Sequence, residues 1–176
     1  MLVDTLTGVT SQFTDGVFTF EVVVVDNDFR QSAEEAVCLF QPGNATKIIY
    51  SCEPEQNIAL ARNKAVQNAN GNLIAFIDDD EFPAKEWLLN LFKTYYNFNA
   101  DGVLGPVKPH FKIEPPQWII KSKLFERRSF ETGTILKNSK YTRTGNALLS
   151  RNVLHGQKRP FDPHFGLSDG EDTDFF

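Results

Sequence analysis

The chain has 176 residues, of which 41% are hydrophobic and 23% are charged, and its formal net charge is −5. This length and composition are typical of one folded domain and exclude a disordered chain. The acidic balance argues against nucleic-acid binding, and the densest basic stretch, 123–128, is interpreted as solvated surface. The sequence contains neither a visible secretory signal nor an apolar run of roughly 20 residues, so we expect a cytoplasmic protein without a transmembrane segment.

The first hundred residues alternate between predicted helices and predicted strands. Apolar spacing predicts a short helix over 3–11, and a β-branched run predicts a buried strand over 18–26. A Ser followed three residues later by Glu is a capping-box pattern, which predicts a helix over 32–41. The later elements are expected as a strand at 47–51, a helix at 57–70, a strand at 73–77, a helix at 83–98 and a strand at 102–107.

This order indicates an α/β fold in which βαβ units form a mostly parallel sheet with helices on both faces. After Pro106 the sequence is proline-rich and irregular, and then predicts a helix over 118–127 and a strand running into a helix over 143–154. No change of composition separates two domains, so one domain over 1–176 is expected. Cys38 and Cys52 lie in apolar stretches and are predicted to be buried free thiols of a reducing compartment.

Two of the predicted strands end in acidic residues, at 26–28 and at 78–81. Ligands of open α/β sheets bind outside the carboxyl ends of the strands, where these side chains would lie. Adjacent carboxylates repel one another unless a hard cation balances them, and oxygen ligands suit Mg²⁺ or Mn²⁺. Asp78 and Asp80 are two residues apart, so an extended strand end would point both to one side.

Other interpretations of the acidic stretch stay open at this point. A short acidic turn could simply stabilise the amino terminus of the following helix. The letters "DDDEF" also resemble the nucleophile loop of haloacid-dehalogenase-like phosphatases, although Phe82 stands where that loop has Thr or Val. Neither a GxGxxG nor a GxxxxGK[ST] motif is present, which leaves a Rossmann dinucleotide site and a P-loop unsupported.

A second acidic group, Glu171 and Asp172 with Asp174 beyond, closes the chain. Gly166 and Gly170 precede it, as expected where a loop turns sharply beside a ligand. An ordinary helix amino terminus rich in Asp and Glu would give a similar pattern.

The order of these parts resembles the family 2 glycosyltransferases, which have the GT-A fold. The matching stretches are "FEVVVVDND", "NIALARNKAVQNANGNLIAFIDDDEFP", "TGNALLSRNVL" and "FDPHFGLSDGEDTDFF". The resemblance covers nearly the whole chain and implies an inverting transferase that moves a sugar from a nucleotide-diphosphate donor, most often a UDP-sugar, to an acceptor hydroxyl. The acceptor would be a glycan, a lipid-linked glycan or another hydroxyl compound.

The resemblance also implies roles for residues at the donor end of the site. Asp26 and Asn27 would lie against the nucleobase, and Asp78 would contact the ribose region and share the metal with Asp80. The metal, Mg²⁺ or Mn²⁺, would stabilise charge on the leaving diphosphate. Arg62, on the helix near this crevice, is a candidate donor contact, and a structural role remains equally open for it.

At the acceptor end, Asp172 matches the catalytic base of the family, and Glu171 stands beside it with a side chain expected to point elsewhere. A carboxylate on the far face of the sugar can remove the proton of the attacking hydroxyl, so no catalytic triad is needed. The three histidines show no paired-ligand spacing and are interpreted as structural. Trp118 could stack on a sugar or pack in the core.

Relative to the family pattern, the first strand and the region beyond the second acidic group are missing, which suggests truncation at both ends. The resemblance divides the chain into a nucleotide-sugar-binding half, 1–106, and an acceptor-side half, 107–176. A sheet without its first strand exposes an apolar edge, so self-association is expected. The alternative function is an inactive nucleotide-sugar-binding fragment or interaction module, and the expected location is the cytoplasm, including its membrane face.

Overall fold

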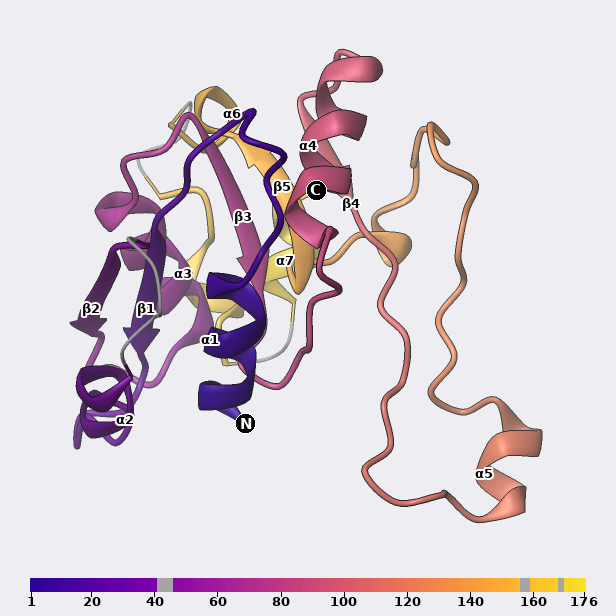
Figure 1. Ribbon diagram of the computed structural model, residues 1–176, viewed down its shortest axis with the longest axis horizontal. Coiled ribbons are helices and arrows are strands. Elements are labelled where there is room, and N and C mark those ends of the chain that lie inside the picture. Colours follow the sequence, from indigo (N-terminus) through magenta and orange to yellow (C-terminus); the bar gives the residue numbers. More distant parts are fainter. Residues whose placement is uncertain (41–45, 156–158, 168–169) are drawn as a thin grey trace.

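The computed structural model describes residues 1–40, 46–155, 159–167 and 170–176, with only the backbone described at residue 155 (Figure 1). Helices and strands alternate through most of it, which confirms the α/β class. In chain order the elements are α1 (Leu2–Thr10), β1 (Val22–Asp26), α2 (Glu34–Leu39), β2 (Ile48–Cys52), α3 (Ile58–Asn68), β3 (Leu73–Ile77), α4 (Trp87–Asn97), β4 (Gly102–Leu104), α5 (Gln117–Ser122), η1 (Ser139–Tyr141), β5 (Asn146–Ser150), α6 (Arg151–His155), η2 (Pro163–Phe165) and α7 (Glu171–Phe175).

The strands form two hydrogen-bonded groups. β1 and β2 pair in parallel, with Asp26 opposite Cys52 at their carboxyl ends. β5 lies between β3 and β4 and runs antiparallel to both, with Ile77 of β3 opposite Asn146. β3 and β4 therefore run in the same direction, but each pairs only with β5, so among the described strands parallel pairing is limited to β1 and β2. The antiparallel placement of β5 was not predicted, and it inserts residues 146–150 between β3 and β4 (Figure 1).

The core lies where α3 and the segment after α6 pack against β3 and β5. Its buried members are apolar and come from two stretches of the chain, 59–74 and 149–161: Ala59, Val66, Ile74, Leu149, Leu154 and Phe161. The Phe161 ring is fully buried and packs edge-on against Phe76 and at a tilt against Phe175, with centroids 5.8 and 4.9 Å apart. Burying such a ring contributes roughly 2–3 kcal/mol, so this cluster holds α3, β3 and α7 together.

Several predicted elements differ in detail from the observed ones. The strand predicted at 18–26 begins only at Val22, and the helix predicted from residue 83 begins only at Trp87. The capping box was wrong, because Ala33 is the N-cap of α2 and no side chain caps that helix. The Ala33 amide instead donates to Asp26 Oδ2 at 2.8 Å. The prediction of a buried Cys38 was also wrong, since this residue is exposed.

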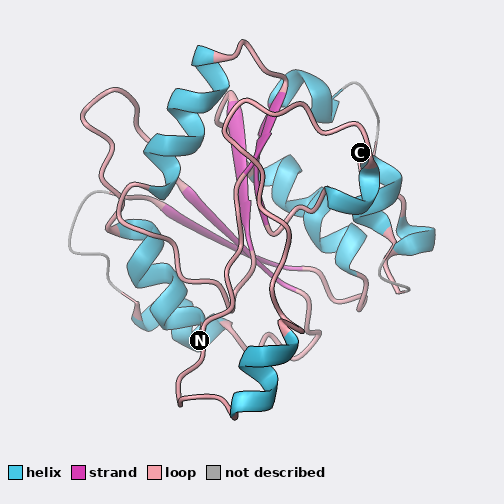
Figure 2. Cartoon of the chain, turned by 90° about the vertical axis from the view of Figure 1, so that its right-hand side faces the viewer, coloured by secondary structure: helices cyan, strands magenta, loops and turns pink. Residues whose placement is uncertain are grey.

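Residues 107–143, here called the arm, leave the body after β4 and return to it just before β5 (Figures 1 and 2). Thr142 is the only buried residue in the arm. Its helix α5 is shorter than predicted, because Lys123 adopts a left-handed conformation (φ 53°) and ends it after one and a half turns. The arm therefore contributes almost nothing to the core.

Candidate active site

The acidic turn, residues 78–81, directly follows β3, so the predicted strand end is confirmed. One hydroxyl from α1 holds its backbone. The Thr5 side chain is 4% exposed and contacts the carbonyl oxygens of Asp79 and Glu81 at 2.8 and 3.0 Å. The conformation of the turn is therefore fixed by a residue that the sequence analysis did not single out.

The segment after the acidic turn is held against the same helix. Gln12 donates its side-chain amide to the Ala84 carbonyl at 2.8 Å and accepts from the Leu88 amide at 2.9 Å. Gly8 faces Pro83, where an added Cβ would come within 3.0 Å of the proline ring. These contacts occupy residues 83–86, which explains why α4 starts later than the sequence predicts.

A single guanidinium group joins the two acidic stretches of the sequence. Arg62 of α3 forms an ion pair with Glu171 Oε1 and another with Asp172 Oδ1, the latter at 3.1 Å. Its second terminal nitrogen lies 4.0 Å from Asp78 Oδ1. We call Asp78, Glu171 and Asp172 the carboxylate cluster. Asp78 precedes the other two by about ninety residues in the chain, and the fold brings all three around one cation.

Asp172 is oriented from a second side. The fully buried Thr144 donates its hydroxyl to Asp172 Oδ1 at 2.6 Å. Arg62 contacts that same oxygen, and no hydrogen bond from the described residues reaches Oδ2. The side chain is 24% exposed, so one carboxylate oxygen is anchored in the protein and the other remains available to a ligand.

Glu171 has a different environment from its neighbour. Its side chain is 6% exposed, and Oε2 is buried without a hydrogen-bond partner among the described residues. The expectation that this side chain points away from Asp172 was wrong, because both carboxylates contact Arg62. They are the first two residues of α7, so the Arg62 side chain of α3 contacts the amino terminus of that helix.

The start of β5 forms one wall of the site. An added Cβ at Gly145 would lie 2.6 Å from Asp78 Oδ2, so only glycine allows this approach of backbone to carboxylate. Asn146 accepts a hydrogen bond from the Trp87 indole at 2.8 Å and donates to the Pro106 carbonyl at 3.1 Å. The stretch "TGN" was part of the family resemblance, but its residues were not predicted to lie in the site.

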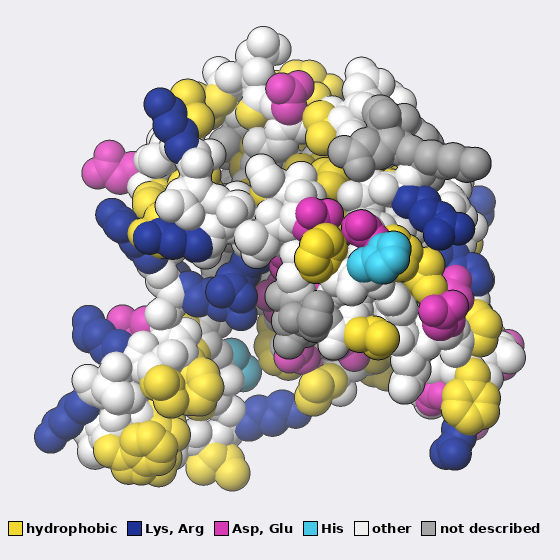
Figure 3. Space-filling view, turned by 180° about the vertical axis from the view of Figure 1, so that it is seen from behind, with side chains coloured by type: hydrophobic (Ala, Val, Ile, Leu, Met, Phe, Trp, Pro, Cys, Tyr) yellow, Lys and Arg dark blue, Asp and Glu magenta, His cyan; other side chains and the backbone are white. Residues whose placement is uncertain are grey.

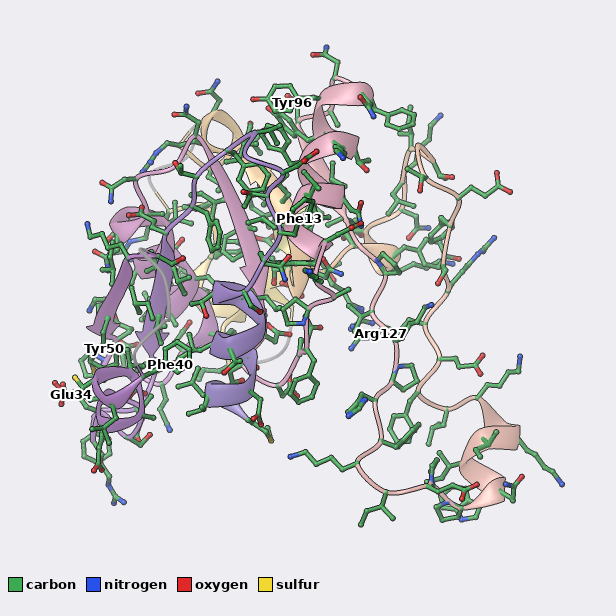
Figure 4. All side chains as sticks on the ribbon, in the orientation of Figure 1. Phe13, Glu34, Phe40, Tyr50, Tyr96 and Arg127 are labelled. Carbon is green, nitrogen blue, oxygen red and sulfur yellow. The ribbon has the colours of Figure 1, made fainter. Side chains whose placement is uncertain are left out.

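Asp26 and Asn27 lie at the end of β1, as predicted, and both are engaged with the protein. Asp26 is buried and accepts a hydrogen bond from the Tyr50 hydroxyl at 3.1 Å. Desolvation of the Tyr50 hydroxyl, together with this contact, raises the pKa of Tyr50 to about 12 (Figure 4). Asn27 donates to the Glu53 carbonyl and accepts from the Asn57 amide, both at 2.9 Å. Asn57 is the N-cap of α3, the helix that carries Arg62. The contact between Asn27 and Asn57 therefore connects the end of β1 to the start of this helix.

The acidic turn carries uncompensated negative charge. Partial burial, and then the nearby charges of Asp80 and Asp172, raise the pKa of Asp78 against the opposing effect of Arg62. Burial and the Asp78 charge raise the pKa of Glu81 to about 7, although the positive charge of Arg127 in the arm acts in the opposite direction. Such crowding would be relieved by a divalent cation, and the donor atoms are the oxygens that Mg²⁺ and Mn²⁺ prefer.

No three acidic, His or Cys side chains of the described residues are grouped as a complete metal site. Asp78 and Asp80 could supply part of one, since Mg²⁺ often takes only one or two carboxylates together with phosphate oxygens of a substrate. Asp80 is exposed at the tip of the turn. The residues present therefore fit a cation that a diphosphate helps to hold.

Other residues considered in the sequence lie away from the carboxylate cluster. Trp118 is 64% exposed on the arm, which excludes core packing, one of the two alternatives left open for it. His110 packs edge-on against Phe82, with ring centroids 5.2 Å apart, and His164 is hydrogen-bonded to Asp162 at 2.8 Å. The side chain of His155 lies outside the described residues.

The model of the family described as glycosyl transferase family 2 matches residues 1–156. The succinoglycan biosynthesis protein ExoM of Rhizobium meliloti (strain 1021) is 37% identical over 158 residues, which is 88% of this chain and 49% of ExoM. The glycosyltransferase AglE of Haloferax volcanii is 31% identical over 103 residues, covering 58% of this chain and 34% of AglE.

Among solved structures, residues 1–349 of S. aureus TarS superimpose with a TM-score of 0.68. A second TarS structure, in complex with UDP-GlcNAc, gives the same score at 23% identity and covers 99% of this chain and 48% of TarS. This likeness shows the fold. The chain spans about half the length of ExoM and of the TarS 1–349 chain. No helix in the described ranges is long and apolar enough to cross a membrane.

Proposed function

The chain belongs to glycosyl transferase family 2, and we propose that it carries the donor site and the catalytic base of an inverting sugar transferase. The observation that carries this proposal is the carboxylate cluster around Arg62, which joins the acidic turn after β3 to the amino terminus of α7. Such a transfer needs one group at the leaving diphosphate and one at the attacking hydroxyl, and the two acidic stretches supply them.

The donor is a nucleotide-diphosphate sugar, and a UDP-sugar is our first choice. S. aureus TarS, whose fold this chain shares, has been solved in complex with UDP and with UDP-GlcNAc. The nucleobase lies at the end of β1, near Asp26 and Asn27, and the ribose lies toward Asp78. Because both β1 side chains are already hydrogen-bonded within the protein, they shape the base pocket more than they bind through free polar atoms.

Asp80 and Asp78 are the residues that would hold a divalent cation, Mg²⁺ or Mn²⁺. When bound, the cation supplies Lewis-acid stabilisation of charge on the departing diphosphate. The crowded carboxylates of the acidic turn favour this binding, because each raises the free energy of its ionised neighbours. Thr5 keeps the turn in the conformation that presents these side chains.

Asp172 is the general base. The acceptor oxygen forms a bond to the anomeric carbon while the bond from that carbon to the diphosphate oxygen breaks, and the diphosphate leaves with the electron pair. The acceptor proton passes to Asp172 Oδ2, the oxygen that no described residue engages. Thr144 and Arg62 fix the other oxygen and hence the direction of the carboxylate. Attack from the face opposite the leaving group inverts the anomeric centre.

Arg62 is a positioning residue in this scheme. It is 13% exposed and neutralises Glu171, which is more deeply buried. It also lies close enough to Asp78 to link the donor end of the site with the base. Glu171 orients Arg62 and does not itself remove the proton. The acceptor is a hydroxyl compound, glycan or lipid-linked, reached in the cytoplasm or at its membrane face.

Calorimetric titration with UDP, in the presence and absence of Mn²⁺, tests the donor site directly. We expect Mn²⁺ to increase the affinity of the 176-residue chain and expect Asp80→Ala to abolish that increase while the thermal midpoint stays unchanged. Asp101→Ala, which removes an exposed acid at β4, is the matched control. An unchanged Mn²⁺ effect in Asp80→Ala would overturn the metal assignment. Binding of UDP-sugars without any turnover would favour the inactive nucleotide-sugar-binding alternative.

A further inference from the structure

The outer end of the arm exposes large apolar side chains. Trp118, Leu124 and Phe125 are each more than half exposed, and Ile113 is 84% exposed. Figure 3 shows hydrophobic side chains gathered on this end of the arm, with Lys and Arg side chains around them. Monomeric proteins rarely leave such a patch in water, and a patch of this kind commonly marks a surface that another body covers.

The arm also differs from the rest of the molecule in charge. It holds nine Lys and Arg against three Asp and Glu, a formal net charge of +6. The remaining residues hold nine Lys and Arg against twenty Asp and Glu, a net charge of −11. A surface of negative potential would therefore attract the arm and repel the body, which gives the molecule one preferred orientation at such a surface.

Basic and apolar side chains alternate around α5 and just beyond it. Lys121 and Lys123 lie between Trp118 and Leu124 in the chain, and all four are exposed. Trp and Lys are the side chains that favour the boundary between acyl chains and head groups, where an indole ring is half immersed and an ammonium group reaches the phosphates. An exposed protein-binding patch would not need this density of Lys, since interface cores are depleted of it.

A groove that runs beside this apolar patch adds further cationic groups. It has a volume of about 640 Å³ and lies between residues 107–111 and 124–127. Lys108, Arg127 and Arg143 line it together with the rings of Phe111 and Phe125. Cationic groups beside exposed rings suit the phosphate and upper acyl chain of a lipid at a membrane surface.

We infer that the arm is a docking element for the surface of an anionic lipid bilayer. The apolar side chains at its end enter the interface, and the Lys and Arg side chains on its flanks contact the lipid phosphates. The acidic body stays on the aqueous side. This inference goes beyond the proposed transferase function and does not depend on it, because it concerns residues outside the carboxylate cluster.

Vesicle co-sedimentation of the purified chain provides the test, with vesicles of phosphatidylcholine alone and of phosphatidylcholine mixed with phosphatidylglycerol. We expect binding to the mixed vesicles only, and weaker binding as salt is raised. In the charge variant, Lys121→Glu with Lys123→Glu, the partition coefficient should fall at least about 25-fold, since each basic group near an anionic surface contributes roughly fivefold. The matched control, Lys85→Glu with Lys93→Glu, changes the net charge equally on the body and should lose far less.

The apolar contribution is tested separately. The variant Trp118→Ser with Leu124→Ser should lose about tenfold or more in partitioning. Tryptophan fluorescence gives an independent measurement, because Trp87 is hydrogen-bonded in the body and Trp118 is exposed. Mixed vesicles should shift the emission of the unaltered chain to shorter wavelength and leave that of Trp118→Phe unchanged.

Three outcomes would overturn the inference. The first is equal binding to both kinds of vesicle, and the second is binding that both arm variants retain. The third is failure to bind vesicles together with a dimer in light scattering that the apolar variant dissolves, which would assign the patch to a second copy of the chain. Titration with UDP measures the transferase proposal independently, so failure of one proposal is distinguishable from failure of the other.

Discussion

The carboxylate cluster and the arm both carry charged side chains, but they place them in different surroundings. In the cluster, three acidic side chains from distant segments surround one mostly buried arginine, and a buried threonine orients one of them. In the arm, most charged side chains lie in water, and the few ion pairs and hydrogen bonds join groups nearby in sequence. The cluster therefore depends on the fold, and we expect the fold to depend little on the exposed side chains of the arm. Substitutions in the two regions should thus have opposite consequences.

The largest difference should appear in turnover. Asp172→Asn keeps the shape of the side chain but cannot accept a proton, so the rate should fall by about 10² to 10⁴ while UDP affinity barely changes. Release of UDP from a UDP-sugar, followed in a preparation that supplies the acceptor, provides the measurement. The change leaves the contacts of Arg62 and Thr144 possible, which limits structural effects.

Glu171→Gln is the control for that prediction, since Glu171 also contacts Arg62 but is nearly buried. Its effect on turnover should be smaller. Normal turnover in Asp172→Asn combined with a large loss in Glu171→Gln would assign the base to Glu171. Loss of UDP affinity in both variants would place the pair at the metal and the base elsewhere.

The next effect concerns stability. Arg62→Ala leaves the buried Glu171 without its ion pair, and we expect the free energy of unfolding to fall by about 3–5 kcal/mol in urea titrations. Arg128→Ala, on the arm, removes an exposed cation and should cost less than about 0.5 kcal/mol. Adding Glu171→Gln to Arg62→Ala should recover part of the loss, because a neutral amide is cheaper to bury than an unpaired carboxylate. No recovery would show that Arg62 stabilises the fold through other contacts.

A smaller loss is expected where α1 holds the acidic turn. Thr5→Val removes the hydroxyl that reaches the Asp79 and Glu81 carbonyl groups, and leaving these groups unpaired should cost about 1–3 kcal/mol. UDP affinity should become less dependent on Mn²⁺, because the turn is no longer held. Thr7→Val, in the same helix, removes an exposed hydroxyl that bonds only within α1 and is the matched control. Equal losses in the two variants would contradict a specific role for Thr5.

These contacts also show what could be read from the sequence and what could not. The strand ends at Asp26 and Asp78 were predictable, because β-branched and apolar runs stop there abruptly. The acidic pair at 171–172 was found through its loop and its resemblance to a family. The link between them was not predictable, because Arg62 and Glu171 lie far apart in the chain, and β5, which lies between them in sequence, pairs antiparallel with β3 and β4. Nothing in the local pattern of 146–150 encodes that antiparallel pairing.

The roles of α1 and of the arm could not be predicted from the sequence either. Thr5 and Gln12 look like ordinary helix residues, and their partners lie more than seventy positions away. The basic stretch 123–128 was interpreted as solvated surface, since six residues read alone show no partner. The fold shows that this stretch adjoins the exposed apolar side chains at the outer end of the arm, which is why it is included in the proposed docking element.

The hydrogen bond between Tyr50 and Asp26, at the end of β1, should make the stability of the protein depend on pH. The raised pKa of Tyr50, about 12, means that folding holds its proton more tightly than the unfolded chain does. This contribution is fully present below pH 10 and is lost as pH rises toward 12. Tyr50→Phe should cost about 0.5–1.5 kcal/mol at neutral pH, and the difference from the unaltered chain should shrink above pH 10. Absorbance of the phenolate would locate the titration, and a midpoint near 10 would refute the contact with Asp26.

The smallest effect on stability is expected at the outer end of the arm. Trp118→Ser removes the largest side chain of α5, but this ring is 64% exposed and absent from the buried core. Its loss should change the free energy of unfolding by less than about 0.5 kcal/mol, because an exposed ring gains little from folding. Phe161→Ala removes a ring that is fully buried and should cost about 3–5 kcal/mol, which sets the scale. The two variants should reverse their order in vesicle binding, since Trp118 would contact lipid and Phe161 would not. A Trp118→Ser variant that unfolds as easily as Phe161→Ala would mean that the arm packs on the body, and the contrast between the two regions would then be lost.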